Sequence, residues 1–304
     1  MKRILTLLFA LTAILPAQSQ QTSLPERLGY PAGTKLLIIH ADDIGVSHSQ
    51  NAATLKAFAG GMVNSGSIMV PCPWFPEIAE YARHNPAADL GLHLTLTSEW
   101  NLYKWGPVAP REKVPTLVDD NGFFYPDVAT VISKGSPADV ETELRAQIER
   151  AKKFGIDPTH FDSHMGTLFY SPEFLKIYIA LGREYKVPVM LINAMTSAYQ
   201  GVTNENDVII DQVFIASPDD YKSGMKEFYT NTLKSVQPGV SCLIIHTAHD
   251  DAEMQAVTKG FVDYGSAWRQ ADLDFFTSEA CQKILREEKI QLITWREIRD
   301  KLLR

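Results

Sequence analysis

Short apolar runs alternate with amphipathic stretches along most of the chain, and this alternation constrains the fold more than any other feature. Apolar runs of about four to eight residues are typical of buried strands, and longer amphipathic stretches predict helices. We expect strands at residues 35–41, 64–70, 90–96, 159–161, 187–192, 239–245 and 290–293. The pattern therefore predicts an α/β fold, a (β/α) barrel, complete or distorted, of about seven parallel strands in a single domain.

Helices are expected between these strands. Their residues are 47–59, 75–84, 137–154, 172–185, 218–235, 278–288 and 295–303. Ser47 or Ser49 is placed to cap the first helix. Residues 99–126 are rich in Pro, Gly and Trp and show no clear period, so we expect a long loop insertion there. Because no repeat or low-complexity linker divides the sequence, residues 20–304 are expected to form one domain.

The N-terminus has the order of a secretory signal peptide. Lys2 and Arg3 precede an apolar run at residues 4–15, and small residues follow at positions 17 and 19. An apolar run of about 12 residues is too short for a bilayer core of about 30 Å, which disfavours a membrane anchor. We therefore expect residues 1–19 to be a signal peptide, and the mature chain to be secreted or periplasmic without a membrane span.

The charge balance bears on possible partners. The chain has a formal net charge of −7, and loss of Lys2 and Arg3 would bring it to −9. An acidic chain without a Lys/Arg-rich run has no electrostatic basis for binding nucleic acid or an anionic membrane. The three cysteines lie in apolar surroundings, and we interpret them as buried small side chains. The oligomeric state stays open, a homodimer included.

Asp and His side chains stand at the carboxyl ends of four expected strands. They are Asp42, Asp43, His93, Asp162, His164 and His246. In parallel α/β folds, chemistry gathers at this edge of the sheet. Taken singly, each residue also has a structural explanation, because Asp often caps turns and a His in an apolar strand is often a core residue. Together, one Asp and two His make a suitable set of ligands for Zn²⁺.

Such a site would be hydrolytic. A metal of this kind lowers the pKa of bound water and polarises a carbonyl group. A nearby carboxylate can deprotonate that water, and a His can protonate the leaving group. The sequence has no Walker-type run, no G-x-G-x-x-G, no G-x-S-x-G and no H-E-x-x-H, so it does not indicate a nucleotide site, a serine hydrolase or a zincin.

The motifs resemble those of the YdjC-like carbohydrate deacetylases, a family that includes the chitooligosaccharide deacetylases. The resemblance rests on H-A-D-D-I-G at residues 40–45, G-L-H-L-T-L-T at 91–97, T-H-F-D-S-H at 159–164, and His246. It runs from about Leu36 to Leu292, nearly the whole mature chain.

The resemblance implies a distorted barrel that holds one divalent metal ion per chain through Asp43, His93 and His164. Zn²⁺ is the preferred ion, and Mg²⁺ or another divalent metal is the alternative. Asp42 would be the general base and His246 the general acid. The implied reaction is removal of N-acetyl groups from a carbohydrate such as an amino-sugar oligosaccharide.

Two positions depart from the pattern of the family. Gly166 stands where relatives usually have a second His after D-S-H. The family's His-Pro-Gly after the late strand is replaced by a run from His246 to His249, which makes His249 a second candidate for the acid. The sugar, its chain length and the acyl group are therefore left open.

Two other functions fit the same sequence. A metal-independent glycosidase would pair Asp42 with a second carboxylate across the sugar. A non-catalytic carbohydrate-binding protein would keep an aromatic groove and tolerate the loss of Asp42. The aromatic residues that would stack on sugar rings, or else anchor the insertion, are Trp74, Trp100, Tyr103, Trp105, Phe124 and Tyr125.

Overall fold

A curled parallel sheet forms the centre of the molecule. The structure, a computed structural model, describes residues 22–304, so the expected signal peptide lies outside the described residues. The strand order is β4-β3-β2-β1-β8-β7, and β9 pairs with the first part of β1. The strands are β1 (Lys35–Ile44), β2 (Ser65–Ile68), β3 (Leu90–Leu94), β4 (Phe161–Ser163), β7 (Gln212–Ile215), β8 (Gly239–Ile245) and β9 (Gln291–Leu292).

Further contacts curl this sheet towards closure. Two more strands, β5 (Leu191–Ile192) and β6 (Ile209–Ile210), pair with each other in parallel, and a single residue separates β6 from β7. Phe161 of β4 forms a parallel bridge with Val189, just before β5. The strands thus form a single-domain, distorted (β/α) barrel, and the predicted fold class is confirmed.

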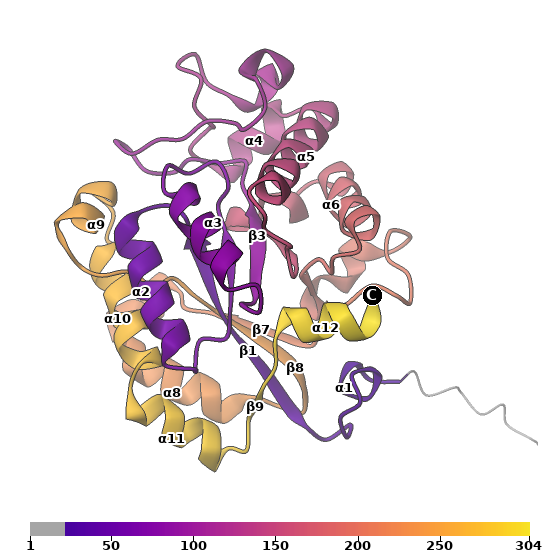
Figure 1. Cartoon of the computed structure of the whole chain (residues 1–304), viewed down its shortest axis with the longest axis vertical. Helices are drawn as coiled ribbons and strands as arrows, with labels where there is room; N and C mark the ends of the chain where they lie inside the picture. The colour runs from indigo at the N-terminus through magenta and orange to yellow at the C-terminus, as the bar shows by residue number, and fades with distance from the viewer. Residues whose placement is uncertain (1–21) are drawn as a thin grey trace, which may run out of the picture.

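Helices cover both flanks of the sheet (Figure 1). They are α1 (Leu24–Arg27), α2 (His48–Ala59), α3 (Phe75–His84), α4 (Val128–Lys134), α5 (Pro137–Lys153), α6 (Pro172–Tyr185), α7 (Pro218–Ser223), α8 (Met225–Ser235), α9 (Ala252–Val257), α10 (Ser266–Phe276), α11 (Glu279–Glu287) and α12 (Trp295–Leu302). In Figure 1, α2, α8, α10 and α11 lie on one flank, and α5 and α6 lie together on the other. Within residues 22–304, no helix combines the length and the apolar character needed to cross a membrane.

Local signals in the sequence account for most of these elements. Ser47 caps α2, because its Oγ accepts a hydrogen bond of 3.0 Å from the backbone N–H of Gln50. Ser136 and Ser171 cap α5 and α6 in the same way, and each is followed by a proline at the first helical position. The observed bounds of α3, α6 and β8 agree with those predicted from the sequence.

One expected helix is divided. The helix predicted at residues 218–235 breaks at Gly224, whose φ of +118° is a conformation that glycine adopts far more readily than other residues. The result is the pair α7 and α8. The insertion at 99–126 is mostly irregular, as expected, with short 3₁₀ turns at Arg111–Lys113 and Pro115–Leu117.

The central strands are buried on both faces. Leu36 to Ile39 in β1 are fully buried, because helices cover the sheet on either side. The three cysteines, Cys72, Cys242 and Cys281, are buried, as the sequence predicted, and they are free. Polar side chains therefore meet at the carboxyl ends of the strands, at one edge of the packed barrel.

Candidate metal centre

The carboxyl ends of β1, β3 and β4 bring Asp and His side chains together. The pairing register of β1 with β2 shifts between Ala41 and Ile44, and Asp43 in this bulge has a φ of +65°. A non-glycine residue in this conformation costs about 1–3 kcal/mol and is typical of functional sites. The bulge lets the adjacent carboxylates of Asp42 and Asp43 contact different partners, which is the division of labour expected from the sequence.

Asp43, His93 and His164 form a compact set of donor atoms. Oδ1 of Asp43 is 3.5 Å from Nε2 of His93 and 3.4 Å from Nδ1 of His164, and these two nitrogens are 3.1 Å apart. Ligand atoms bound tetrahedrally to Zn²⁺ at about 2.0–2.1 Å lie about 3.3 Å from one another. Oδ1 of Asp43 is buried and has no hydrogen-bond partner among the described residues. The three residues therefore fit a divalent metal ion.

Arg269 of α10 fixes the other oxygen of Asp43. Its Nη2 donates a hydrogen bond of 2.7 Å to Oδ2, while Nη1 donates to Gln50 and Nε to the backbone carbonyl of Tyr264. Burial would raise the pKa of Asp43, but Arg269 and the imidazoles of His164 and His246 hold it well below its usual range. Asp43 is therefore a carboxylate whose one free oxygen faces the two imidazoles.

Two carboxylates orient the imidazoles. Oδ1 of Asp162 is 2.8 Å from Nδ1 of His93, and Oε2 of Glu99 is 3.1 Å from Nε2 of His164. Each contact leaves the opposite ring nitrogen facing Asp43. Burial opposes protonation of His164, but Glu99 and Asp43 raise its pKa to about 10. This concentration of negative charge favours a cation at the centre, a place that a divalent metal ion would fill.

Asp42 lies beside these donor atoms, and its Oδ1 has closer contacts than its Oδ2. Its Oδ1 is 2.9 Å from Nε2 of His40 and accepts a hydrogen bond of 3.2 Å from Oγ of Ser67. Its Oδ2 is 3.8 Å from Nε2 of His93. Oδ2 therefore lies next to the donor set without belonging to it, as a proton acceptor for bound water would.

His246 belongs to the same neighbourhood, and His249 does not. Asp272 of α10 accepts a hydrogen bond of 2.8 Å from the backbone N–H of His246, at the end of β8. Burial lowers the pKa of His246 to about 4, against the attraction of Asp43. The backbone of His249 is instead bonded to Ser49, and its side chain influences the pKa of Asp251.

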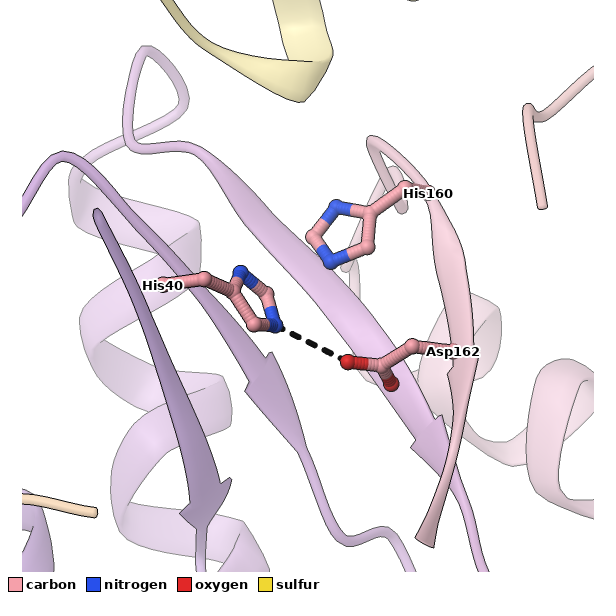
Figure 2. Close-up of side chains that lie close together, drawn as sticks. All are labelled: His40, His160 and Asp162. Atoms are coloured by element: carbon pink, nitrogen blue, oxygen red, sulfur yellow. Dashed lines mark hydrogen bonds and ion pairs between the residues drawn. The ribbon is translucent and has the colours of Figure 1, made fainter. Parts of the chain in front are cut away.

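Of the two histidines in the segment 159–164, only His164 joins the donor set. His160 stacks on Trp295 at a centroid distance of 5.1 Å, and its ring fills the space beside Gly91, where a Cβ atom would lie within 2.3 Å of it. Figure 2 shows this ring beside His40, whose Nε2 contacts Asp162. His160 is therefore part of the support beneath the site.

Glu99 and Arg269 were missed by the sequence analysis. Glu99 lies at the start of an irregular insertion, and its only signal was an acidic residue shortly after the His93 strand. Arg269 lies on α10, where the buried polar side chains of Arg269 and Asp272 interrupt the periodic pattern of apolar residues. The sequence placed His40 in a motif but gave it no role.

The aromatic residues of the insertion mainly anchor it. Trp100, Trp105 and Phe124 are only 2%, 3% and 1% exposed, and Nε1 of Trp105 donates a hydrogen bond to the carbonyl of Thr97. Trp74, by contrast, is 38% exposed. The sugar-stacking interpretation is therefore wrong for the three buried rings.

The chain is similar to several known proteins over most of its length. A family model described as YdjC-like protein matches residues 36–287. A carbohydrate deacetylase of Thermus thermophilus is 29% identical, with coverage of 91% of this chain and 98% of that protein. One of Brevibacillus brevis is 30% identical, with coverage of 86% and 99%. The crystal structure of an Enterococcus faecalis protein named for cellobiose-phosphate cleavage has a TM-score of 0.74 at 25% identity, with coverage of 87% of this chain and 99% of that one.

Proposed function

Because the chain belongs to the YdjC-like protein family, we propose that it is a metal-dependent hydrolase that removes N-acetyl groups from a carbohydrate such as an amino-sugar oligosaccharide. The relatives named carbohydrate deacetylases, which match over most of their length, support the reaction. The observation that carries the metal requirement is the buried Oδ1 of Asp43, which has no hydrogen-bond partner within residues 22–304 and lies 3.4–3.5 Å from nitrogens of His93 and His164.

One divalent ion would be held by these three residues, and Zn²⁺ suits a set of two imidazoles and one carboxylate. When bound, it would lower the pKa of a water molecule and polarise the amide carbonyl. The carboxylates of Asp162 and Glu99 keep the two imidazoles in the tautomer that presents a lone pair to the ion.

Asp42 and His246 would carry out the two proton transfers of the reaction. Oδ2 of Asp42 would accept the proton of the attacking water as general base. His246 would deliver a proton to the amine that leaves, and its neutral imidazole would first have to receive that proton within the site, since burial lowers its pKa to about 4. His246 is preferred to His249 as the acid because it lies close enough to Asp43 to lower the pKa of that residue.

A glycosidase is the alternative, because the similar Enterococcus faecalis protein is named for cleavage of cellobiose-phosphate. It needs two carboxyl groups that face each other across the scissile bond, at about 5–9.5 Å. Here both oxygens of Asp162 are engaged by His40 and His93, and Glu99 is engaged by His164. Asp162 therefore has no free oxygen to act opposite Asp42, and Glu99 is tied to His164 through Oε2, which favours deacetylation.

We also propose a secreted or periplasmic location, on the basis of the signal-peptide order of residues 1–19. The substrate would then be a carbohydrate outside the cytoplasm.

The test is a product analysis on N-acetylated oligosaccharides. The purified mature protein is stripped with a chelator, and free acetate and chain length are measured before and after Zn²⁺ is restored. We expect acetate release with unchanged chain length, only when the metal is present. Shortened oligosaccharides formed without metal would replace this proposal with the glycosidase.

A further inference from the structure

His40 connects two carboxylates that the reaction uses in different ways. Its Nε2 is 2.9 Å from Oδ1 of Asp42 and 2.9 Å from Oδ2 of Asp162. The side chain is fully buried, in β1, two residues before the general base (Figure 2). The other oxygen of Asp162 contacts Nδ1 of His93. One ring nitrogen therefore touches both the base and the residue that orients a metal ligand.

The neighbouring atoms determine whether Nε2 of His40 carries a hydrogen. Carboxylate oxygens only accept hydrogen bonds, so a nitrogen in contact with two of them is stable there only as an N–H donor. The second ring nitrogen, Nδ1, is 2.9 Å from Oγ of Ser65, and Oγ of Ser67 is 3.2 Å from Nε2. The ring of His160 packs edge-on at a centroid distance of 4.8 Å. Asp42, Asp162 and His160 are thus the titratable groups that face His40.

We propose that His40 is a positioning residue whose Nε2–H holds Asp42 and Asp162 together, and so couples the general base to the metal ligand His93. This inference rests on the proposed function, because it takes Asp42 as the base and His93 as a ligand. In it, His40 touches neither the substrate nor the metal. It aims Oδ2 of Asp42 at the site and keeps Asp162 against His93.

The charges of the site support this role. Asp42, Asp43 and Asp162 are buried within one region, and in the described part of the chain Arg269 forms an ion pair with Asp43 alone. Burial would lower the pKa of His40, but its contacts with Asp162 and Asp42 raise it to about 10. A protonated His40 therefore supplies a positive charge for the two carboxylates that Arg269 does not reach, and this reduces their mutual repulsion.

Two substitutions separate the donor from the volume of the ring. His40→Gln places an amide N–H at about the position of Nε2, whereas His40→Met fills a similar volume without a donor. Zn²⁺ affinity is measured by competition with a chelating dye, and kcat and KM by acetate release. Because residues that orient metal ligands typically contribute 10–100-fold to affinity or activity, we expect His40→Met to weaken Zn²⁺ binding at least 10-fold and to lower kcat with little change in KM. We expect His40→Gln to stay within about threefold of the wild type in Zn²⁺ affinity.

A double-mutant cycle tests the coupling directly. If His40 acts through Asp162, His40→Met should cost at least threefold less Zn²⁺ affinity in an Asp162→Asn background than in the wild type. Additive effects, equal losses in the Gln and Met variants, or wild-type affinity in His40→Met would each overturn the proposal. If the Met variant does not fold, nitrogen NMR of the intact wild-type protein decides. A protonated Nε2 on His40 between pH 6 and 8 supports the proposal, and an unprotonated one refutes it.

These outcomes are distinguishable from failure of the proposed function. A wild-type protein that releases acetate while His40→Met matches it in affinity and rate would refute only the role of His40. A wild-type protein that binds Zn²⁺ through a His40-dependent site but releases no acetate would refute only the reaction.

Discussion

Arg269 and Asp43 form a buried ion pair in which Nη2 of the arginine lies 2.7 Å from Oδ2 of the aspartate. The pair joins α10 to the bulge at the end of β1, two segments 226 residues apart in sequence. It leaves the other oxygen of Asp43, Oδ1, directed at Nε2 of His93 and Nδ1 of His164. The proposed metal site would thus depend on a cation, Arg269, that is not itself a ligand.

The first prediction concerns the removal of this cation. Arg269→Met should destabilise the metal-free protein by about 3–5 kcal/mol, because a buried carboxylate is left without its partner. Zn²⁺ should recover part of this loss, since the ion supplies positive charge beside the same carboxylate. Urea unfolding with and without Zn²⁺ measures both effects.

Arg183→Met is the matched control for this experiment. Arg183 also pairs with a carboxylate, that of Asp207, but its side chain is 44% exposed. Its loss should cost less than about 1 kcal/mol and should not respond to Zn²⁺. Equal costs for the two substitutions would contradict the importance assigned to Arg269.

The second prediction separates the two adjacent aspartates. Asp42→Asn should bind metal like the wild type but lose about 10²–10⁴-fold in the rate of acetate release, because only the base is removed. Asp43→Asn should lose the metal itself. Metal analysis and acetate release on both variants give the comparison. Metal loss in Asp42→Asn with retention in Asp43→Asn would reverse the assignment of the two roles.

A third prediction concerns Glu99, which orients His164 from the insertion. Glu99→Ala should weaken Zn²⁺ binding by about 10–100-fold, because the imidazole loses the partner that fixes its tautomer. Glu99→Gln keeps an oxygen that can accept from Nε2 and should lose less. Titration with a competing chelator ranks the three proteins, and an alanine variant as tight as the wild type would exclude Glu99 from the site.

The sequence predicted the parts of this site that lie at strand ends. Asp42, Asp43, His93 and His164 lie at or just after the carboxyl ends of apolar strands, and parallel strands present these ends at one edge of a sheet. The sequence did not predict Glu99, because the insertion has no period that fixes the direction of its side chains.

The contacts that support the site also could not be predicted from local sequence patterns. His40 and Asp162 are 122 residues apart, and their contact depends on the order β4-β3-β2-β1. The helix that carries Arg269 was not predicted, because buried Arg269 and Asp272 interrupt its apolar face. The break at Gly224 was missed because a single glycine is tolerated within a helix.

The fourth prediction is a pH dependence of stability away from the metal. Glu143 of α5 is fully buried and accepts hydrogen bonds from the backbone N–H groups of Val108 and Ala109 in the insertion. Burial raises its pKa from 4.5 to about 7 in spite of these bonds. Between these two values the native chain holds a proton that the unfolded chain has lost. The free energy of unfolding should therefore fall as the pH rises through this window, by about 1.4 kcal/mol per pH unit from this group.

Glu143→Gln provides the comparison, because glutamine does not titrate. Urea unfolding of both proteins at pH 5 and pH 8 isolates the contribution of the carboxyl group. The wild-type protein should lose about 2–4 kcal/mol more than the variant between these pH values. Parallel curves would show that Glu143 titrates alike in the folded and unfolded chains.

The most direct test of the account is the metal content of the purified mature protein after incubation with Zn²⁺ and removal of the excess. His164→Ala removes a ligand, and His249→Ala, outside the donor set, is its control. We predict close to one metal ion per chain in the wild type and in His249→Ala, and almost none in His164→Ala. A wild-type protein without metal, or a His164→Ala variant that holds as much as the wild type, would contradict the site of Asp43, His93 and His164.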